Sequence, residues 1–595
     1  MTVYTDLLKL YDSVESTLVG KHSYLKFANN KKLNTLVPVF HQYVNAGVMI
    51  NLDAKGELIS VTPSTEYRIV SPTNLQASTR TGTTIAPQPL HDTSKYLFGT
   101  SKGFEAYITQ LEKWLNATND PFLTAVYTYI SKGTLQDDLT EETSLLESKK
   151  PTYVFTVDGE YPWENVDFIN QYIEYYWGVL QEKIDSMSKE EQASNAVTHK
   201  DIFMGMDYLT GKQAICMAKS PKMKLTIDSG AKLMTANDKT GFSYRGLFPG
   251  PSFSSIGIDS AFKVTSMVKY LEDNQKIGNG DNGEEILIWD DSTTQEVPSW
   301  LKVIAPSDKS DTGSAMFNKV KGLLSQPSDK DISDTVKIVH LRANNPGQLG
   351  FGSYQGISFE KYKENLLRWA NLNGGTGLNV YSVGRTIYSD SHKSASNKKL
   401  RSQAIDDITE CIFAGKQVPL KYMLKIETEL ANPIGYHQGE NSEASDEWNK
   451  SVNIYAELRK YNGVNKMDKR SYLFGKLLFN LDKIERDAVY NKQKKSGNSK
   501  EPTKHATLAS KFTNMYMRTP AQAYSVIKPR LTTGYINGSD YEYSSESKLN
   551  DIIAEIGEDW SDESLSPDMY LGYAEAFKAD KESRKLNKKA VDTKK

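Results

Sequence analysis

The stretch at residues 471–485, SYLFGKLLFNLDKIE, constrains the fold of this chain more than any other. Its apolar side chains recur at steps of three and four residues, the spacing that places side chains on one face of an α-helix. That face comprises Leu473, Leu477, Leu481, Ile484 and Ala488. The charged residues that fall mostly elsewhere are Lys476, Asp482, Lys483 and Arg486. The stretch therefore predicts an amphipathic helix that packs one face against a core.

The remaining sequence predicts the α+β class: a mixed α/β N-terminal body followed by an all-α C-terminal helical bundle. In the N-terminal body, apolar runs at 47–52 and 58–61 flank a turn at 53–56, which is typical of a β-hairpin. Residues 99–132 predict helix, with Tyr107, Leu111, Trp114 and Leu115 on one face. The runs TYVFTV, EILIW and VKIVHL predict later strands. We expect three regions: 1–150, 151–397 and the helical bundle at 398–595.

Composition excludes several classes of protein. The chain has 72 basic and 74 acidic residues, so its net charge of -2 does not indicate a nucleic-acid partner, and any such surface must be local. Two cysteines, Cys216 and Cys411, are too few for a disulfide framework. The N-terminus shows no signal-peptide pattern and no run is long and apolar enough for a membrane span, so we expect a cytoplasmic protein.

Charge is segregated in the last quarter of the chain. Residues 467–530 carry 14 basic and five acidic residues, a net charge of +9, whereas residues 540–575 carry one and 11, a net charge of -10. Basic residues interleaved with Phe512, Tyr516 and Tyr524 can follow a nucleic-acid strand, although a solvated helix face over core aromatics has the same pattern. The candidate strand path comprises Lys492, Lys494, Lys495, Lys500, Lys504, Lys511, Arg518, Lys528 and Arg530.

A second candidate site lies between residues 71 and 99. Short or planar hydrogen-bonding side chains surround a glycine there, which suits the reading of base edges and phosphates. A Ser/Thr-rich surface loop is the alternative. The residues are Asn74, Gln76, Ser78, Thr79, Arg80, Thr81, Gly82 and Thr83.

The chemistry-bearing motifs favour no enzyme. Gly278, Gly280 and Gly283 match the spacing of a dinucleotide loop, but a helical pattern precedes them and a strand follows, which favours a surface turn. Asp290 and Asp291 end a strand without partner carboxylates at a recognisable spacing. The eight histidines form no metal-binding pair, and both cysteines are typical of buried residues. We expect no catalytic residue, no metal and no cofactor.

Several segments, in order, resemble the Csd-type large subunit of the type I-C CRISPR interference complex (Cascade). The strongest is the 471–485 stretch, supported by the sequence KFTNMYMRTPAQAY at 511–524 and by Met569-Tyr-Leu-Gly-Tyr. Weaker similarities are Arg80-Thr-Gly-Thr-Thr-Ile-Ala-Pro, the sequence DTSKYLFG from Asp92, and Tyr153-Val-Phe-Thr-Val-Asp-Gly. The resemblance covers nearly the whole chain.

This resemblance implies a non-catalytic subunit that reads the protospacer-adjacent motif in double-stranded DNA, stabilises the R-loop and helps recruit a helicase-nuclease. It also implies a guide CRISPR RNA, with backbone and guide-end-binding Cascade subunits as partners. The helical region would also be made alone, as a small subunit translated from the same gene, with Met467 as the candidate start and Met423 as the rival. A metal-dependent nuclease and a stand-alone nucleic-acid-binding scaffold remain the alternatives.

Overall fold

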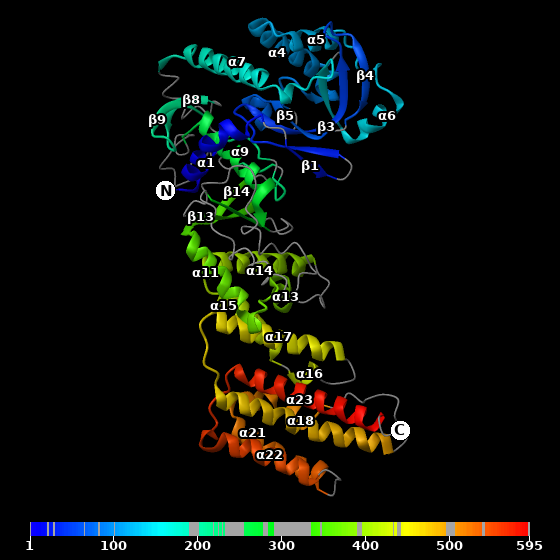
Figure 1. The fold of residues 1–595 in the computed structure, drawn as a ribbon, viewed down its shortest axis with the longest axis vertical. Coiled ribbons are helices and arrows are strands. Elements are labelled where there is room, and N and C mark those ends of the chain that lie inside the picture. Colours follow the sequence, from blue (N-terminus) through cyan, green and yellow to red (C-terminus); the bar gives the residue numbers. More distant parts are fainter. Residues whose placement is uncertain are drawn as a thin grey trace. The chain divides into compact units, whose positions relative to one another are not determined.

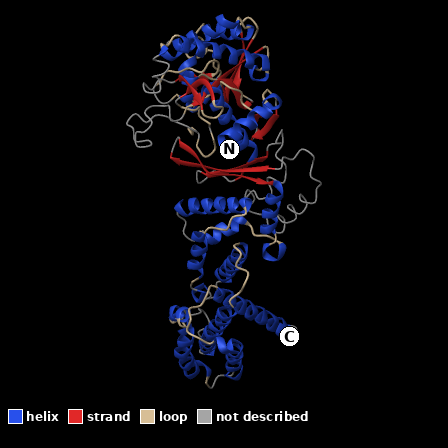
Figure 2. Ribbon diagram, turned by 90° about the vertical axis from the view of Figure 1, so that its left-hand side faces the viewer, coloured by secondary structure: helices blue, strands red, loops and turns tan. Residues whose placement is uncertain are grey.

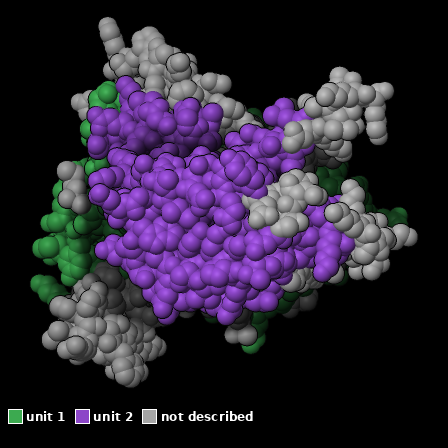
Figure 3. Space-filling model, turned by 90° about the horizontal axis from the view of Figure 1, so that it is seen from below, with its two compact units in different colours: residues 1–307, 327–360 green, residues 308–326, 361–595 purple. Residues whose placement is uncertain are grey.

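The computed structural model divides the chain into two compact units (Figure 3). Unit 1 comprises residues 1–307 and 327–360, and unit 2 comprises residues 308–326 and 361–595. All described strands, red in Figure 2, belong to unit 1. The structure describes residues 2–20, 23–27, 30–64, 66–80, 84–99, 101–189, 202–217, 219–223, 225–228, 230–232, 255–277, 284–290, 335–345, 348–388, 395–431, 433–436, 442–495, 506–537 and 542–592.

Unit 1 contains three sheets with helices packed against them (Figure 1). The seven-stranded sheet has the order β1-β2-β5-β3-β7-β6, with β4 pairing β3; the others are β10-β9-β8 and β11-β12-β13-β14. The strands are β1 (Ser23–Phe27), β2 (Asn30–Asn34), β3 (His41–Leu52), β4 (Leu58–Pro63), β5 (Glu66–Pro72), β6 (Asp92–Thr93), β7 (Thr152–Val157), β8 (Ile202–Asp207), β9 (Lys212–Met217), β10 (Ile256–Gly257), β11 (Lys276–Ile277), β12 (Glu284–Asp290), β13 (Thr335–Asn345) and β14 (Gln348–Ser358). Its helices are α1 (Val3–Leu18), α2 (Leu75–Thr79), α3 (Ser94–Leu97), α4 (Lys102–Thr118), α5 (Pro121–Ile130), α6 (Glu141–Ser144), α7 (Val166–Asp185) and α9 (Ile258–Gln275).

The predicted hairpin is confirmed. Strands β3 and β4 are antiparallel, and the Asp53 side chain accepts hydrogen bonds from the backbone N–H groups of Lys55 and Glu57, which closes the turn. The predicted strand TYVFTV is β7, which pairs in parallel with β3. One sheet therefore spans the first two predicted regions on either side of residue 150.

The helical pattern predicted at 99–132 is confirmed, and the structure divides it into two helices. Helix α4 ends at Asn119, whose φ of 51° is left-handed, and α5 begins with Asp120 as its cap and Pro121 in its first turn. Tyr107, Leu111 and Trp114 are buried as predicted. Both helices pack into one core with β3, β7 and α7.

All regular secondary structure described in unit 2 is helical, so the predicted α+β class with a C-terminal helical bundle is confirmed. The predicted boundary at 397 falls inside this unit. Its helices are α11 (Phe359–Ala370), α12 (Leu372–Gly375), α13 (Val380–Ile387), α14 (Ala395–Ala414), α15 (Leu420–Leu430), α16 (Pro433–Tyr436), α17 (Ser442–Tyr461), α18 (Lys469–Lys495), α19 (Leu508–Lys511), α20 (Thr513–Arg518), α21 (Pro520–Leu531), α22 (Glu542–Ile556) and α23 (Asp568–Asp592). No helix among the described residues has the length and apolarity needed to cross a bilayer.

The amphipathic helix predicted at 471–485 is α18, and Leu473, Leu477 and Leu481 are buried as expected. The placement of Asp482 off the buried face is wrong. Its carboxylate is buried and accepts a hydrogen bond from the hydroxyl of Thr507 at 2.6 Å. The buried Glu485 accepts from the backbone N–H of Leu508 at 2.7 Å. Two acidic residues of α18 thus bind the start of α19.

Helices α18 and α23 cross at a pair of glycines. A Cβ atom added to Gly475 would overlap the carbonyl oxygen of Met569, and one added to Gly572 would overlap that of Tyr472. Because glycine alone lets two backbones approach this closely, both positions require it. The two segments belong to the 471–485 stretch and the Met569-Tyr-Leu-Gly-Tyr segment, so these similarities, about a hundred residues apart, form one contact.

Candidate nucleic-acid interface

The candidate loop of unit 1 is held by an ion pair between the half-buried Arg80 and the buried Asp92. Arg80 donates two hydrogen bonds to Asp92, Nη1 to Oδ2 and Nη2 to Oδ1, each at 2.8 Å, and a third to the carbonyl of Ala86 at 3.0 Å. The Asp92 side chain is fully buried and also accepts from the backbone N–H of Gln88 at 2.7 Å. Paired N–H groups and paired carboxylate oxygens match in geometry, so this bond fixes the loop ends.

Other polar residues of this loop are also bonded within unit 1. Asn74 caps α2 by accepting from the N–H of Ala77 at 2.7 Å, and its amide donates to Gln110 at 2.9 Å. The hydroxyls of Ser78 and Thr79 both donate to the carbonyl of Leu75. Gln76, by contrast, is exposed.

The remaining predicted members, Thr81, Gly82 and Thr83, lie outside the described residues. Nothing in the structure tests whether any residue of the loop contacts DNA, so the assignment stays a prediction. Sequence reasoning missed Asp92 as the partner of Arg80. The signal was present, since both residues begin segments that resemble the same family.

In unit 2, the acidic block neutralises part of the basic block. Lys528 pairs with Glu546, Lys476 with Glu575 and Lys469 with Glu555. Arg470 donates to three backbone carbonyls, those of Asp559, Ser561 and Glu563. The net charge of +9 in the sequence therefore overstates the positive charge that this region presents to a partner.

Four predicted cations remain exposed without an ion pair to another described residue: Lys492, Lys511, Arg518 and Arg530. The Arg530 guanidinium lies 5.7 Å from the centre of the Phe512 ring. Lys494 and Lys495 continue α18, but their side chains are not described. Lys500 and Lys504 lie outside the described residues.

Of the two alternatives for the aromatic residues of the basic block, Tyr516 fits the one in which they belong to the core. Its ring is fully buried and its hydroxyl donates to the carbonyl of Phe474 at 2.9 Å. Tyr524 is half-buried with its ring 5.2 Å from that of Trp560. A ring that packs the core offers no open face to a nucleotide, so any strand contact here depends on the cations.

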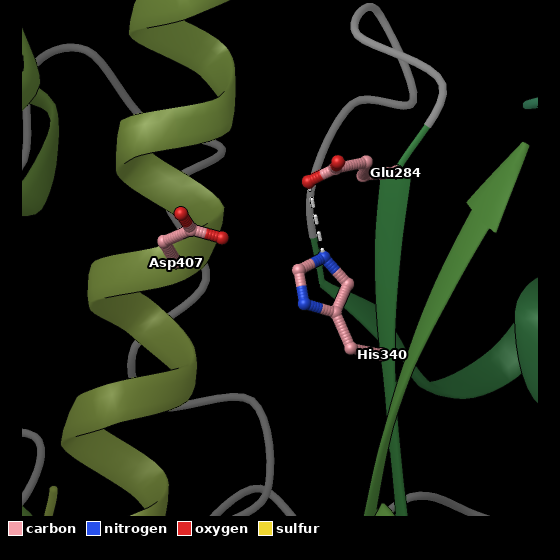
Figure 4. A group of neighbouring side chains, drawn as sticks. All are labelled: Glu284, His340 and Asp407. Atoms are coloured by element: carbon pink, nitrogen blue, oxygen red, sulfur yellow. Dashed lines mark ion pairs between the residues drawn. The ribbon is translucent and has the colours of Figure 1, made fainter. Parts of the chain in front are cut away.

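One acid–imidazole pair lies in unit 1. His340 of β13 and Glu284 of β12 face each other with 3.3 Å between Nε2 and Oε2 (Figure 4). Arg342 lies 3.6 Å from the same carboxylate, which compensates its charge. Asp407, also labelled in Figure 4, belongs to α14 of unit 2, where Lys421 and Tyr422 bond its carboxylate. Among the described residues of unit 1, this pair offers two ligands, which is fewer than the three protein ligands of a catalytic zinc site.

The other chemistry-bearing candidates are buried or not described. Asp290 is fully buried at the end of β12, whereas Asp291 and the three glycines at 278–283 lie outside the described residues. Burial raises the pKa of Cys216, and raises that of Cys411 to about 12. Both thiols are buried as predicted, and neither favours the thiolate form that a nucleophile needs.

Comparison with known protein families agrees with the fold and with the contact between the α18 and α23 segments. The chain matches the family model described as CRISPR-associated protein (Cas_Csd1) over residues 22–575. No curated protein is significantly similar to it. The match defines a CRISPR-associated, Cascade-type subunit. The chain belongs to the Cas_Csd1 family, so the predicted resemblance to a Csd-type large subunit is confirmed.

Proposed function

We propose that this protein is the non-catalytic large subunit of a type I-C CRISPR RNA-guided complex. In this role it recognises the protospacer-adjacent motif in double-stranded DNA, stabilises the R-loop and helps recruit a helicase-nuclease. The family match over residues 22–575 is the observation that carries the proposal. Because base pairing with the guide supplies target specificity, such a protein needs only short-motif and backbone contacts. A net charge of -2 with local exposed cations is compatible with a protein that contacts only a short motif and the backbone.

Within this function, Gln76 is the residue of the loop that we assign to motif reading. It is exposed, and an amide side chain can form two hydrogen bonds with the edge of an adenine. Asn74 and Arg80 hold the loop in place through their bonds within unit 1. Thr81, Gly82 and Thr83 remain candidates for backbone contacts.

The test is target binding by the purified complex with Gln76→Ala. Loss of one base-edge contact should raise the Kd for DNA that carries the motif by roughly tenfold. DNA with a scrambled motif should bind equally to both proteins. Gln181→Ala on α7 serves as a matched control, because Gln181 is also exposed on unit 1. Unchanged affinity and unchanged motif preference in Gln76→Ala would reject the assignment.

We also propose Met467 as the internal start of a small subunit. Met467 is exposed, and it lies between the end of α17 and the start of α18. A product that begins there keeps α18 whole together with Asp468, which accepts a hydrogen bond from the N–H of Ser471. The rival Met423 is buried inside α15, so a product from it would begin in mid-helix. Intact-mass analysis of the complex before and after Met467→Ala is the test: a fragment that persists would rule this start out.

A further inference from the structure

A groove of about 1250 Å³ in unit 1 is lined by α4, α7 and residues 74–76 at the start of α2. Trp114, Tyr172 and Leu180 line it and are buried, so they form its floor. Its α4 wall runs from Lys102 to Ala117, which is about 22 Å of helix. The lining positions on α4 recur every three or four residues, so one continuous helix face borders the groove.

Three positions along the two helices of the groove carry a methyl group or no side chain at all. Ala106 and Ala117 on α4 and Gly178 on α7 line it, and a Cβ added to Gly178 would meet nothing within 4 Å. Small residues along a helix face let another backbone approach closely. The groove thus has an apolar, aromatic floor between two helix faces with room above them.

Charges of both signs surround this floor in equal number. All six are exposed, and none forms an ion pair with another described residue. The basic members are Lys102, Lys113 and Lys183, and the acidic members are Glu105, Glu174 and Glu182. A balanced rim does not attract a phosphate backbone, whereas it can pair with a peptide that carries both signs.

The aromatic side chains also argue against a nucleic-acid strand. The Trp114 ring stacks on Tyr175 with 6.1 Å between centroids, and the Tyr172 ring stacks on Tyr176 at 5.8 Å. These rings therefore cover one another's faces, and a base needs an open face on which to stack.

We propose that the α4–α7 groove binds an amphipathic α-helix of a partner protein. A helix with its side chains is about 10 Å across and rises about 1.5 Å per residue, so ten residues occupy roughly 1200 Å³, which matches the groove. Apolar residues at positions i, i+3, i+4 and i+7 of that helix pack on the floor, and its flanking charges pair with the rim. This interaction goes beyond the motif-reading role proposed for Gln76, and Gln76 lines the same groove.

Site-specific photo-crosslinking in the full chain, purified with its bound partners, tests the proposal. Benzoylphenylalanine replaces Val179, which lines the groove, or Val166, which is also an exposed valine of α7 but lies outside it. We expect crosslinks from position 179 to one protein segment with the amphipathic spacing, roughly tenfold above those from position 166. A synthetic peptide of that segment should bind the full chain.

Blocking the groove completes the test. A Cβ atom at position 178 meets nothing within 4 Å, so Gly178→Trp should leave the backbone in place. It should weaken binding of that peptide by roughly tenfold or more, the loss expected when an interface pocket is filled. Its melting temperature should match that of the unmodified chain. Three results would overturn the proposal: crosslinks from position 179 to nucleic acid or to this chain itself, no excess over position 166, or full peptide binding by a folded Gly178→Trp protein.

Discussion

The two candidate nucleic-acid surfaces differ in how many of their polar side chains form hydrogen bonds or ion pairs within the protein. In unit 1, Asn74 and Arg80 bond to side chains or backbone of the same unit, and Gln76 is exposed. In unit 2, acidic side chains pair with several lysines of the basic block, yet Lys511, Arg518 and Arg530 have no such pair among the described residues. Composition identified both regions, but it does not distinguish a residue that binds a partner from one that holds the fold.

The difference follows from the kind of structure that carries each surface. A loop has few backbone hydrogen bonds of its own, so its polar side chains replace them, as Arg80 does through Asp92 and Ala86. A helix satisfies its backbone internally, which leaves a long cation such as Lys511 or Arg518 free to extend into solvent. A polar side chain on a loop is therefore often bonded within the protein and is then not available to a ligand.

The largest effect should come from the helix crossing that supports the unit 2 surface. Gly475→Leu forces a side chain into the carbonyl of Met569, so we expect a loss of about 4 kcal/mol or more in unfolding free energy, measured by urea denaturation. Gly534→Ala is the control, since a Cβ there meets nothing within 4 Å. Equal stability of the two variants would mean that the crossing can relax and that position 475 does not require glycine.

The next effect distinguishes residues that stabilise the candidate loop of unit 1 from the residue proposed to contact DNA. Arg80→Ala leaves the buried Asp92 carboxylate without its cation, which should cost about 3 kcal/mol or more in unfolding free energy. Gln76→Ala should change stability by less than about 0.5 kcal/mol, since Gln76 is exposed.

The variant Asp92→Ala tests whether Arg80 acts only by stabilising the loop. If Arg80 only holds the loop, Asp92→Ala and Arg80→Ala should weaken DNA binding alike at a temperature where both are folded. If Asp92→Ala keeps full affinity while Arg80→Ala loses it, Arg80 contacts DNA directly, and the contrast between the two surfaces fails.

Stability in acid should fall because of two buried histidines in unit 1. Burial lowers the pKa of His41 to about 4 and that of His91 to about 3. Each is neutral when folded, whereas the unfolded chain binds protons below pH 6.5, so this stability is complete above pH 6.5 and is lost as pH falls toward 4. For His41 the loss should reach about 3 kcal/mol.

Asparagine variants test this. His41→Asn keeps a donor for the carbonyl of Val39, and His91→Asn keeps an acceptor for the N–H of Phe155, but neither titrates. Each should flatten the dependence of unfolding free energy on pH between 6.5 and 4. Tyr172→Phe, beside the His41 ring, should lower stability equally at every pH. An unchanged slope in both asparagine variants would assign the acid sensitivity to other groups.

Local patterns in the sequence were sufficient for some elements and not for others. The hairpin of β3 and β4 was predictable because Asp53 closes its turn within four residues. The break between α4 and α5 was also encoded, in Asn119 and Pro121, although apolar periodicity continued across it. Burial of Asp482 was not predictable, since its partner Thr507 lies 25 residues along the chain in another helix. The free cations of unit 2 could not be chosen from the sequence, because pairing depends on contacts between helices.

The smallest effect tests whether those free cations contact a nucleic-acid strand. A cation that neutralises a phosphate releases a counterion, so each lost contact should reduce the slope of log affinity against log salt by about 0.7 to 0.9. Replacing Lys511, Arg518 and Arg530 together by glutamine should therefore flatten the slope by roughly 2 to 3. Lys528→Gln is the matched control, because Glu546 already pairs with that lysine and its loss should leave the slope nearly unchanged. A flatter slope for the triple variant alone assigns the strand to the unpaired cations. The same slope in both proteins would mean that none of these four cations contacts a phosphate. The cations of unit 2 would then resemble Asn74 and Arg80 of unit 1, whose bonds lie within the protein.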